Sequence, residues 1–147
     1  MKKKDDTNPY LYILARSDLT SLSCGKLAAQ CSHASNAMVY KMKKSGDAKM
    51  QNLLHQWESQ SGGQGFGTCI VLDCGNEETM IEILNSLKEV VPSRKGQYIS
   101  GIVNDSSYPI KDGDITHHIS LNTCAYVFFD KNDEVLCNVL SDMKLYK

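Results

Sequence analysis

The sequence predicts an α/β protein: a three-layer α/β/α sandwich in which helices cover both faces of a small mixed β-sheet of about four strands. Two observations lead to this class. Short β-prone runs are interleaved with amphipathic helical stretches, and the first run feeds the first helix through a short loop, as in a βα unit. The chain has 147 residues, which suits one domain with a sizeable core. We therefore expect one domain over residues 9–147, preceded by a polar, disordered tail over 1–8.

Hydrophobic patterning predicts where the strands lie. The expected strands cover 10–15, 68–72, 97–103 and 123–129, with 115–121 as a short extra strand. The run 10–15 is continuously apolar, which is typical of a buried central strand. The glycine-rich segment 61–67 is expected to be a flexible connector. The segment 104–114 is rich in Asp, Ser, Pro and Gly, and it is expected to be a loop.

Apolar residues at helical spacing predict four helices. They are expected over 23–42, 47–60, 76–87 and 133–143. Their predicted N-caps are Ser23, Asp47, Asn76 and either Asn132 or Asp133. In the second helix, Trp57 is interpreted as a core residue.

Composition restricts the function. The net charge is −1, so RNA binding would have to come from a local basic patch, for which 2–4, 41–44 and 94–95 are candidates. Each of these runs also suits a solvated face or a chain end. No apolar run approaches the length of a membrane span, and the first residues lead into no signal-peptide core. A cytoplasmic protein without membrane contact is expected.

The six cysteines could suggest disulfides or a metal site. Their spacing is not that of a disulfide scaffold, and no C-x-x-C pair occurs. We expect reduced thiols that serve as small apolar residues, and neither a metal nor a cofactor.

The stretch 21–42 carries a polar stripe beside its apolar face. Lys26, Gln30 and His33 stand at i, i+4 and i+7, so they share one side of the helix. Lys26 falls in the first turn, where a cation beside unpaired backbone N–H groups can hold a phosphate or a developing oxyanion. A surface lysine on an amphipathic helix is the alternative. A Walker phosphate loop is excluded, because Thr20 replaces its first glycine and Leu27 replaces the residue that would hold magnesium.

The segment 25–34 has the sequence GKLAAQCSHA. It closely resembles the G-K-x-A-A-Q-C-x-H-A signature of the archaeal/eukaryotic-type peptidyl-tRNA hydrolases, the second peptidyl-tRNA hydrolase family. Trp57-Glu58 and Glu77-Glu78-Thr79 resemble the middle of that family, and the closing MKLY resembles its L-K-L-Y ending. The resemblance implies the same sandwich fold. It also implies hydrolysis of the ester of peptidyl-tRNA without a metal, release of free tRNA and peptide, and a homodimer.

The family's proposed site combines the motif lysine, an aspartate in a D-x-G-x-T segment, and a threonine that opens the last strand. The resemblance assigns the lysine to Lys26 and the last threonine to Thr123. The aspartate is Asp105 or Asp112, and Thr116 stands for the first threonine. The residues expected to bind substrate are Gln30, His33 and Lys41. A packing role for His33, with a satisfied ring nitrogen, is the alternative.

The chain departs from the family pattern beyond the third strand. Ser106 to Pro109 replace the glycine and threonine after Asp105, and the Asp112-to-Thr116 spacing occurs seven residues later. Two hypotheses follow: an active hydrolase, or a catalytically silent relative that binds tRNA or a protein. Of the two we expect the hydrolase. Convergence of Asp105 or Asp112 and a threonine hydroxyl on the Lys26 amine would favour it, and a loop that carries both carboxylates away would count against it.

Overall fold

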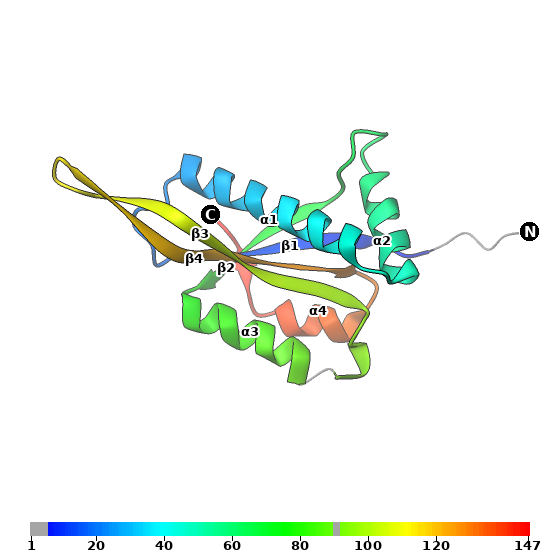
Figure 1. Ribbon diagram of the computed structural model, residues 1–147. Coiled ribbons are helices and arrows are strands. Elements are labelled where there is room, and N and C mark those ends of the chain that lie inside the picture. Colours follow the sequence, from blue (N-terminus) through cyan, green and yellow to red (C-terminus); the bar gives the residue numbers. More distant parts are fainter. Residues whose placement is uncertain (1–5, 90–91) are drawn as a thin grey trace, which may run out of the picture.

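The computed structural model describes residues 6–89 and 92–147 (Figure 1). The elements, in chain order, are β1 (Pro9–Arg16), α1 (Cys24–Lys44), α2 (Ala48–Glu58), β2 (Cys69–Gly75), α3 (Glu77–Glu89), the 3₁₀ turn η1 (Pro92–Arg94), β3 (Tyr98–Asp112), β4 (Ile115–Asp130), α4 (Glu134–Leu140) and β5 (Lys144–Leu145). Of the expected tail, residues 1–5 lie outside the described residues. Residues 6–8 pack on the domain, since the Asn8 amide donates to Asp130 Oδ1 at 2.9 Å.

Within the described residues, the strands form one mixed sheet in the order β3-β4-β1-β2-β5. The central strand β1 pairs in parallel with β2 and antiparallel with β4. Figure 1 shows α1 and α2 on one face of the sheet and α3 and α4 on the other. The predicted three-layer sandwich is confirmed. The two-residue strand β5, which pairs with β2, was not predicted.

Each helical layer buries its own core. On one face, Trp57 packs edge-on against Phe128 with ring centroids 6.0 Å apart, and its Nε1 donates to the Thr68 carbonyl at 2.9 Å. This confirms Trp57 as a core residue. On the other face, Met80 and Leu136 are fully buried among strand residues such as Phe129. Both helical faces therefore remove apolar surface from water, which is the main stabilising term of the fold.

The helix starts agree with most of the predicted caps. Asp47, Asn76 and Asp133 each accept hydrogen bonds from backbone amides of the following turn. Ser23 is also an N-cap by position, but within the described residues its hydroxyl makes no capping hydrogen bond. The N-terminal turn of α1 thus keeps backbone N–H groups that no described side chain satisfies.

The expectation of a loop over 104–114 is wrong. These residues continue β3, and 115–121 is the first part of β4, so together they form a long hairpin that projects beyond the sheet (Figure 1). Gly113 follows Asp112 at the turn with φ +61°, as a two-residue hairpin turn with glycine in its first central position requires. Pro109 is tolerated because β3 is an edge strand. The outer residues 111–114 are exposed, which suits their polar composition, whereas α1 still contacts the hairpin at Asp105 and Pro109.

Two further findings concern the sequence expectations. All six cysteines lie among the described residues, and none of them forms a disulfide. No helix in the described part of the chain has the length and apolarity needed to cross a membrane.

Candidate functional site

The polar stripe of α1 meets the base of the β3–β4 hairpin, and Gln30 is the point of contact. The Gln30 amide nitrogen Nε2 donates to Asp105 Oδ2 at 2.8 Å, and its Oε1 accepts a hydrogen bond from Thr123 Oγ1 at 2.7 Å. Gln30 is 3% exposed and Thr123 is 0% exposed. A buried glutamine thus joins a carboxylate on β3 to a hydroxyl on β4.

Two β-bulges bring Asp105 and Thr123 to this position. Val103 pairs with Cys124 and Asn104 pairs with Asn122, so Thr123 is an extra residue on β4. Just beyond Asp105, β3 carries one residue more than β4. This second bulge restores the register of the two strands. Bulges re-aim side chains next to functional sites. Here the two bulges compensate each other, and the side chains of Asp105 and Thr123 both reach Gln30.

Asp105 is held in its ionised form. Its Oδ1 accepts the backbone N–H of Ser107 at 3.0 Å, and its Oδ2 accepts the Gln30 amide. These two hydrogen bonds, with a smaller contribution from nearby His33, hold the pKa of Asp105 below its ordinary value. Asp105 is therefore a fixed negative charge near neutral pH, and it is partly exposed.

Lys26 lies one turn before Gln30 and reaches the hairpin at a different point. Its Nζ donates to the Pro109 carbonyl at 2.8 Å and lies 5.0 Å from the centroid of the Tyr108 ring. Tyr108 is fully buried, and its hydroxyl is 3.1 Å from Ser21 Oγ. Among the described residues Lys26 forms no ion pair with a carboxylate. The carboxylate and the threonine hydroxyl thus converge on Gln30, beside the lysine and not on its amine.

Arg16 also lies in this region, although the sequence pattern did not predict a role for it. It is 8% exposed, and its guanidinium donates to both oxygens of Asp18, at 2.9 and 2.8 Å, and to the Asn122 carbonyl at 3.0 Å. The hydrogen bonds to Asp18 raise the pKa of Arg16, and Arg16 in turn lowers the pKa of Asp18. Because Asn122 precedes Thr123, this clamp ties the end of β1 to the bulge. An arginine directly after a buried strand, two residues before an aspartate, was the available signal.

Three predicted site residues lie elsewhere. Asp112 pairs with Ile115 at the hairpin turn, and Thr116 pairs with Lys111 beside it; both site candidates are exposed. Lys41 follows Lys26 by fifteen residues, about 22 Å along α1. Its Nζ donates to the Ser100 carbonyl on the edge of β3 at 2.6 Å. The cluster around Gln30 therefore includes Asp105 and not Asp112.

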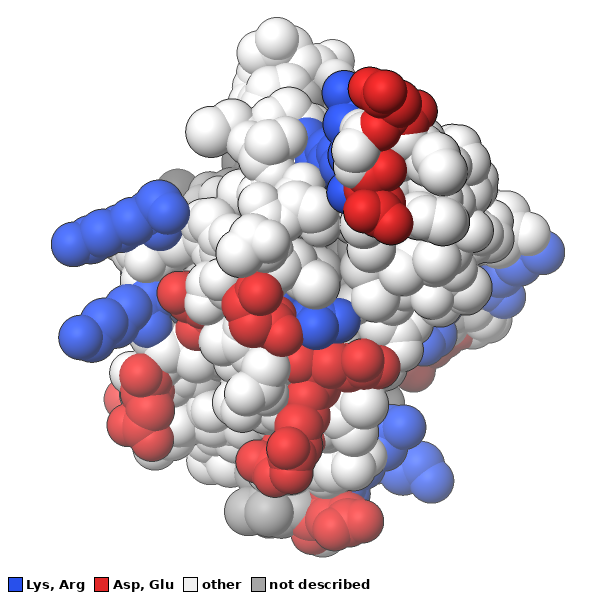
Figure 2. Space-filling view, turned by 90° about the vertical axis from the view of Figure 1, so that its left-hand side faces the viewer, with Lys and Arg blue, Asp and Glu red and all other residues white. Residues whose placement is uncertain are grey.

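Figure 2 faces the end of the molecule where the hairpin projects and α1 begins. Acidic side chains gather in the middle of this face, and basic side chains lie mostly toward its borders. Carboxylates at this end come from the loop after β1, the end of β2 and the start of α3, which carry Asp18, Asp73, Glu77 and Glu78, and from the hairpin, which carries Asp105, Asp112 and Asp114. The surface on the β2 side of the site is thus unfavourable for phosphate groups.

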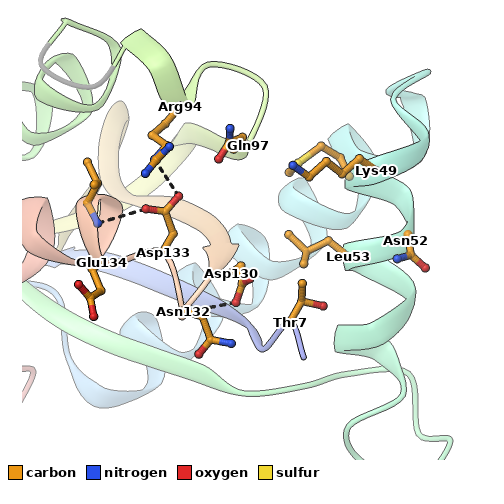
Figure 3. Close-up of a pocket in the computed structure, with 12 residues that line it drawn as sticks. Thr7, Lys49, Asn52, Leu53, Arg94, Gln97, Asp130, Asn132, Asp133 and Glu134 are labelled. Carbon is orange, nitrogen blue, oxygen red and sulfur yellow. Dashed lines mark hydrogen bonds and ion pairs between the residues drawn. The ribbon is translucent and has the colours of Figure 1, made fainter. Parts of the chain in front are cut away.

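A cavity of about 690 Å³ lies at the opposite end of the molecule, between α2, the start of α4 and the turn η1 (Figure 3). Its charged groups hold loops together: Asp133 pairs with Arg94 at 3.1 Å and caps α4, and Asp130 Oδ1 accepts backbone amides from Asn8 and Asn132. No predicted site residue lines this cavity. We assign it no chemistry.

No three His, Cys, Asp or Glu side chains among residues 6–89 and 92–147 come together as a metal site. The fold and the cluster define a three-layer α/β protein whose first helix supplies a lysine and a buried glutamine to the base of an edge hairpin. The sequence model of the family peptidyl-tRNA hydrolase PTH2 matches residues 10–94, more than half of the chain, and the chain belongs to this family. A comparison with curated proteins finds no match. The family match includes Lys26 and Gln30 and ends before β3, so Asp105 and Thr123 lie outside it.

Proposed function

We propose that the protein hydrolyses the ester bond of peptidyl-tRNA, or of an N-blocked aminoacyl-tRNA, and releases free tRNA and peptide without a metal or cofactor. Membership of the peptidyl-tRNA hydrolase family supports this reaction. The observation that carries it is the cluster at the hairpin base, where Gln30 joins Asp105 to Thr123 one turn from Lys26. The sequence around Asp105 departs from the family pattern, yet the Asp105 side chain contacts Gln30 in the motif helix.

Lys26 is proposed to stabilise the oxyanion that forms when water attacks the ester carbonyl. Its ammonium group has three N–H donors, and one of them is bound to the Pro109 carbonyl. The remaining donors can reach a ligand beside the first turn of α1. There the unpaired backbone N–H groups favour the same negative charge. The Pro109 contact fixes the direction of the side chain and lowers the entropic cost of positioning it.

Asp105 is proposed to orient the attacking water or a ribose hydroxyl. Its depressed pKa makes it a weak proton acceptor, so positioning contributes more than proton abstraction in the resting state. Gln30 and Thr123 are too buried to touch a substrate, and we propose that they hold Asp105 in place. His33 is exposed, one turn beyond Gln30, and remains a proposed substrate contact.

We propose that the hairpin tip does not contact the reacting ester. Asp112 and Thr116 lie on the exposed turn, and Asp112 Oδ2 is 3.7 Å from His117 Nε2. Asp112 is three positions beyond Pro109, which binds Lys26, a distance of about 10 Å along a strand.

A catalytically silent tRNA- or protein-binding relative is the second candidate. One observation favours it: the Lys26 amine already has a carbonyl partner and forms no ion pair with a described carboxylate. The two candidates differ in whether an ester is cleaved, which a direct assay decides.

The test is hydrolysis of N-acetyl-aminoacyl-tRNA by the purified protein, with Lys26→Ala and Lys144→Ala measured beside it. Lys144 is an exposed lysine on β5, at the other edge of the sheet. We expect the wild type and Lys144→Ala to release tRNA, and Lys26→Ala to lose about 10²- to 10³-fold in kcat, as removal of an oxyanion donor does. No release by the wild type, with tRNA binding retained, would favour the silent binder. Full activity of Lys26→Ala would remove Lys26 from the mechanism.

A further inference from the structure

A groove runs between α1 and the open edge of β3. Two adjoining cavities, of about 550 and about 390 Å³, share Lys41 and Ile99 in their linings. Their other lining residues are Ala37, Tyr40, Lys44, Ser45, Tyr126, Lys88, Lys95, Gly96, Tyr98 and Ser100. We call the part bordered by Lys41, Lys44, Lys88 and Lys95 the lysine groove.

The charge of the lysine groove is one-sided. Of the described residues that line the two cavities, none is an aspartate or a glutamate. The whole chain has 16 Lys and Arg against 17 Asp and Glu, so the groove concentrates positive charge on an otherwise balanced molecule. The side chains of Lys88 and Lys95 take part in no ion pair with another described residue. Low-charge proteins that bind nucleic acid do so through such local patches.

The groove and the candidate site lie along the same side of α1. Lys26, Gln30, His33, Ala37 and Lys41 recur at spacings of three and four residues, so they follow one side of the helix. This side faces β3, because Gln30 contacts Asp105 and Lys41 contacts Ser100. The track from Lys26 to Lys41 is about 22 Å long, which a short single-stranded nucleic acid segment can span.

Tyr126 forms part of the groove lining and lies against Gly101 of β3. A Cβ atom at Gly101 would lie 2.3 Å from the Tyr126 hydroxyl oxygen, so the glycine lets this ring cross over β3. At the groove wall, Tyr40 is 62% exposed and Lys44 Nζ lies 4.4 Å from the centroid of its ring. Exposed aromatic rings beside lysines suit ribose and base contacts.

The opposite approach to the site is unfavourable for RNA. Asp73 at the end of β2 and Glu77 and Glu78 at the start of α3 lie in that direction, so a phosphate backbone that extended there would meet like charge. The direction along α1 toward the lysine groove carries positive charge at both ends, from Lys26 to Lys41.

We propose that the lysine groove binds the phosphate backbone of the paired acceptor stem of tRNA, while the unpaired 3′ end follows α1 to Lys26. The inference rests on the proposed function, because it takes the ester at the 3′ end as the group presented to Lys26. Lys88 and Lys95, from α3 and the turn before β3, contact the paired region and neither contacts the ester.

The test is binding of uncharged tRNA, of an acceptor-stem minihelix and of a single-stranded oligonucleotide with the 3′-end sequence, each measured by fluorescence anisotropy at several salt concentrations. The variant combines Lys88→Gln with Lys95→Gln. Its control combines Lys144→Gln with Lys147→Gln, an equal loss of charge in and just after β5, the strand at the opposite edge of the sheet. We expect the groove variant to bind the minihelix about 10- to 100-fold more weakly at 0.1 M salt, with a salt slope smaller by about two. The oligonucleotide and the control variant should change little.

The outcomes separate the two proposals. The groove proposal would be wrong if the groove variant bound the minihelix with wild-type affinity and salt slope, or if it lost as much affinity for the single-stranded oligonucleotide as for the minihelix. Neither result would bear on the proposed hydrolysis. Lysine-dependent minihelix binding without ester cleavage would support the groove and overturn the proposed reaction. If the protein bound polyglutamate in preference to the minihelix, the ligand of the groove would be an acidic protein and not RNA. In the hydrolysis assay, the groove variant should raise KM and leave kcat unchanged.

Discussion

Thr123→Val tests the bond on which the candidate site depends. Valine keeps the shape of the buried threonine and removes its hydroxyl, so the Oε1 of Gln30 loses its hydrogen bond without a new cavity. Gln30 is 3% exposed, and a buried acceptor left unpaired costs about 1–3 kcal/mol. For a chain of this size that corresponds to a fall in Tm of roughly 3–10 °C.

Thermal unfolding followed by circular dichroism measures the effect, with Thr116→Val as the matched control. The Thr116→Val substitution makes the same chemical change on the exposed hairpin tip. The Tm of this variant should therefore stay within about 1 °C of the wild type, as for most surface substitutions. Thr123→Val should also lower kcat for the ester while keeping tRNA affinity, because it loosens the residue that holds Asp105. An unchanged Tm for Thr123→Val, or an equal fall for both variants, would refute the role of this hydrogen bond.

Two further predictions concern charge and backbone. The pKa of Asp105 is lowered in the folded protein, so its ionised form stabilises the fold at neutral pH, and this contribution is lost as pH falls through the folded pKa. Carboxyl NMR should place this titration below the ordinary aspartate value, and Gln30→Leu should move it upward; a titration above the ordinary value would contradict the assignment. Gly101→Ala would place a Cβ 2.3 Å from the Tyr126 hydroxyl oxygen and 2.5 Å from the ring carbon Cζ, so we expect a loss of about 1–3 kcal/mol in denaturant unfolding, and a smaller loss on a Tyr126→Leu background that lacks the ring. An equal loss in both backgrounds would show that the clash lies elsewhere.

The sequence carried the architecture because its signals were local. The apolar run that became β1, the helical spacing from Leu27 to Met42 and the caps at Asp47 and Asp133 each depend on residues within one element. Such patterns reflect burial and capping directly. The motif around Lys26 likewise lies within one helix, so its stripe could be recognised before the fold was described.

The hairpin could not be predicted in the same way. Asp, Ser, Pro and Gly between 104 and 114 are turn-forming by composition, yet they form an exposed edge strand whose pairing with β4 supplies the stability. The choice between Asp105 and Asp112 depended on two bulges that shift the strands by compensating single residues. Neither bulge has a signature in the sequence. The Arg16 clamp depends on the Asn122 carbonyl, a backbone contact over more than a hundred residues.

The strand pairing of the projecting hairpin, which forms an arm beyond the sheet, also determines how the length of this arm can change. Its register is set at the base, from Tyr98 opposite Phe129 to Pro109 opposite His118, while the tip from Lys111 to Thr116 is exposed throughout. A deletion on one strand would turn every later side chain to the other face, whereas removal of a cross-strand pair would leave the base in place. The arm can therefore be shortened or extended in paired steps, and its tip is the place to insert a crosslinker or a label without disturbing Asp105.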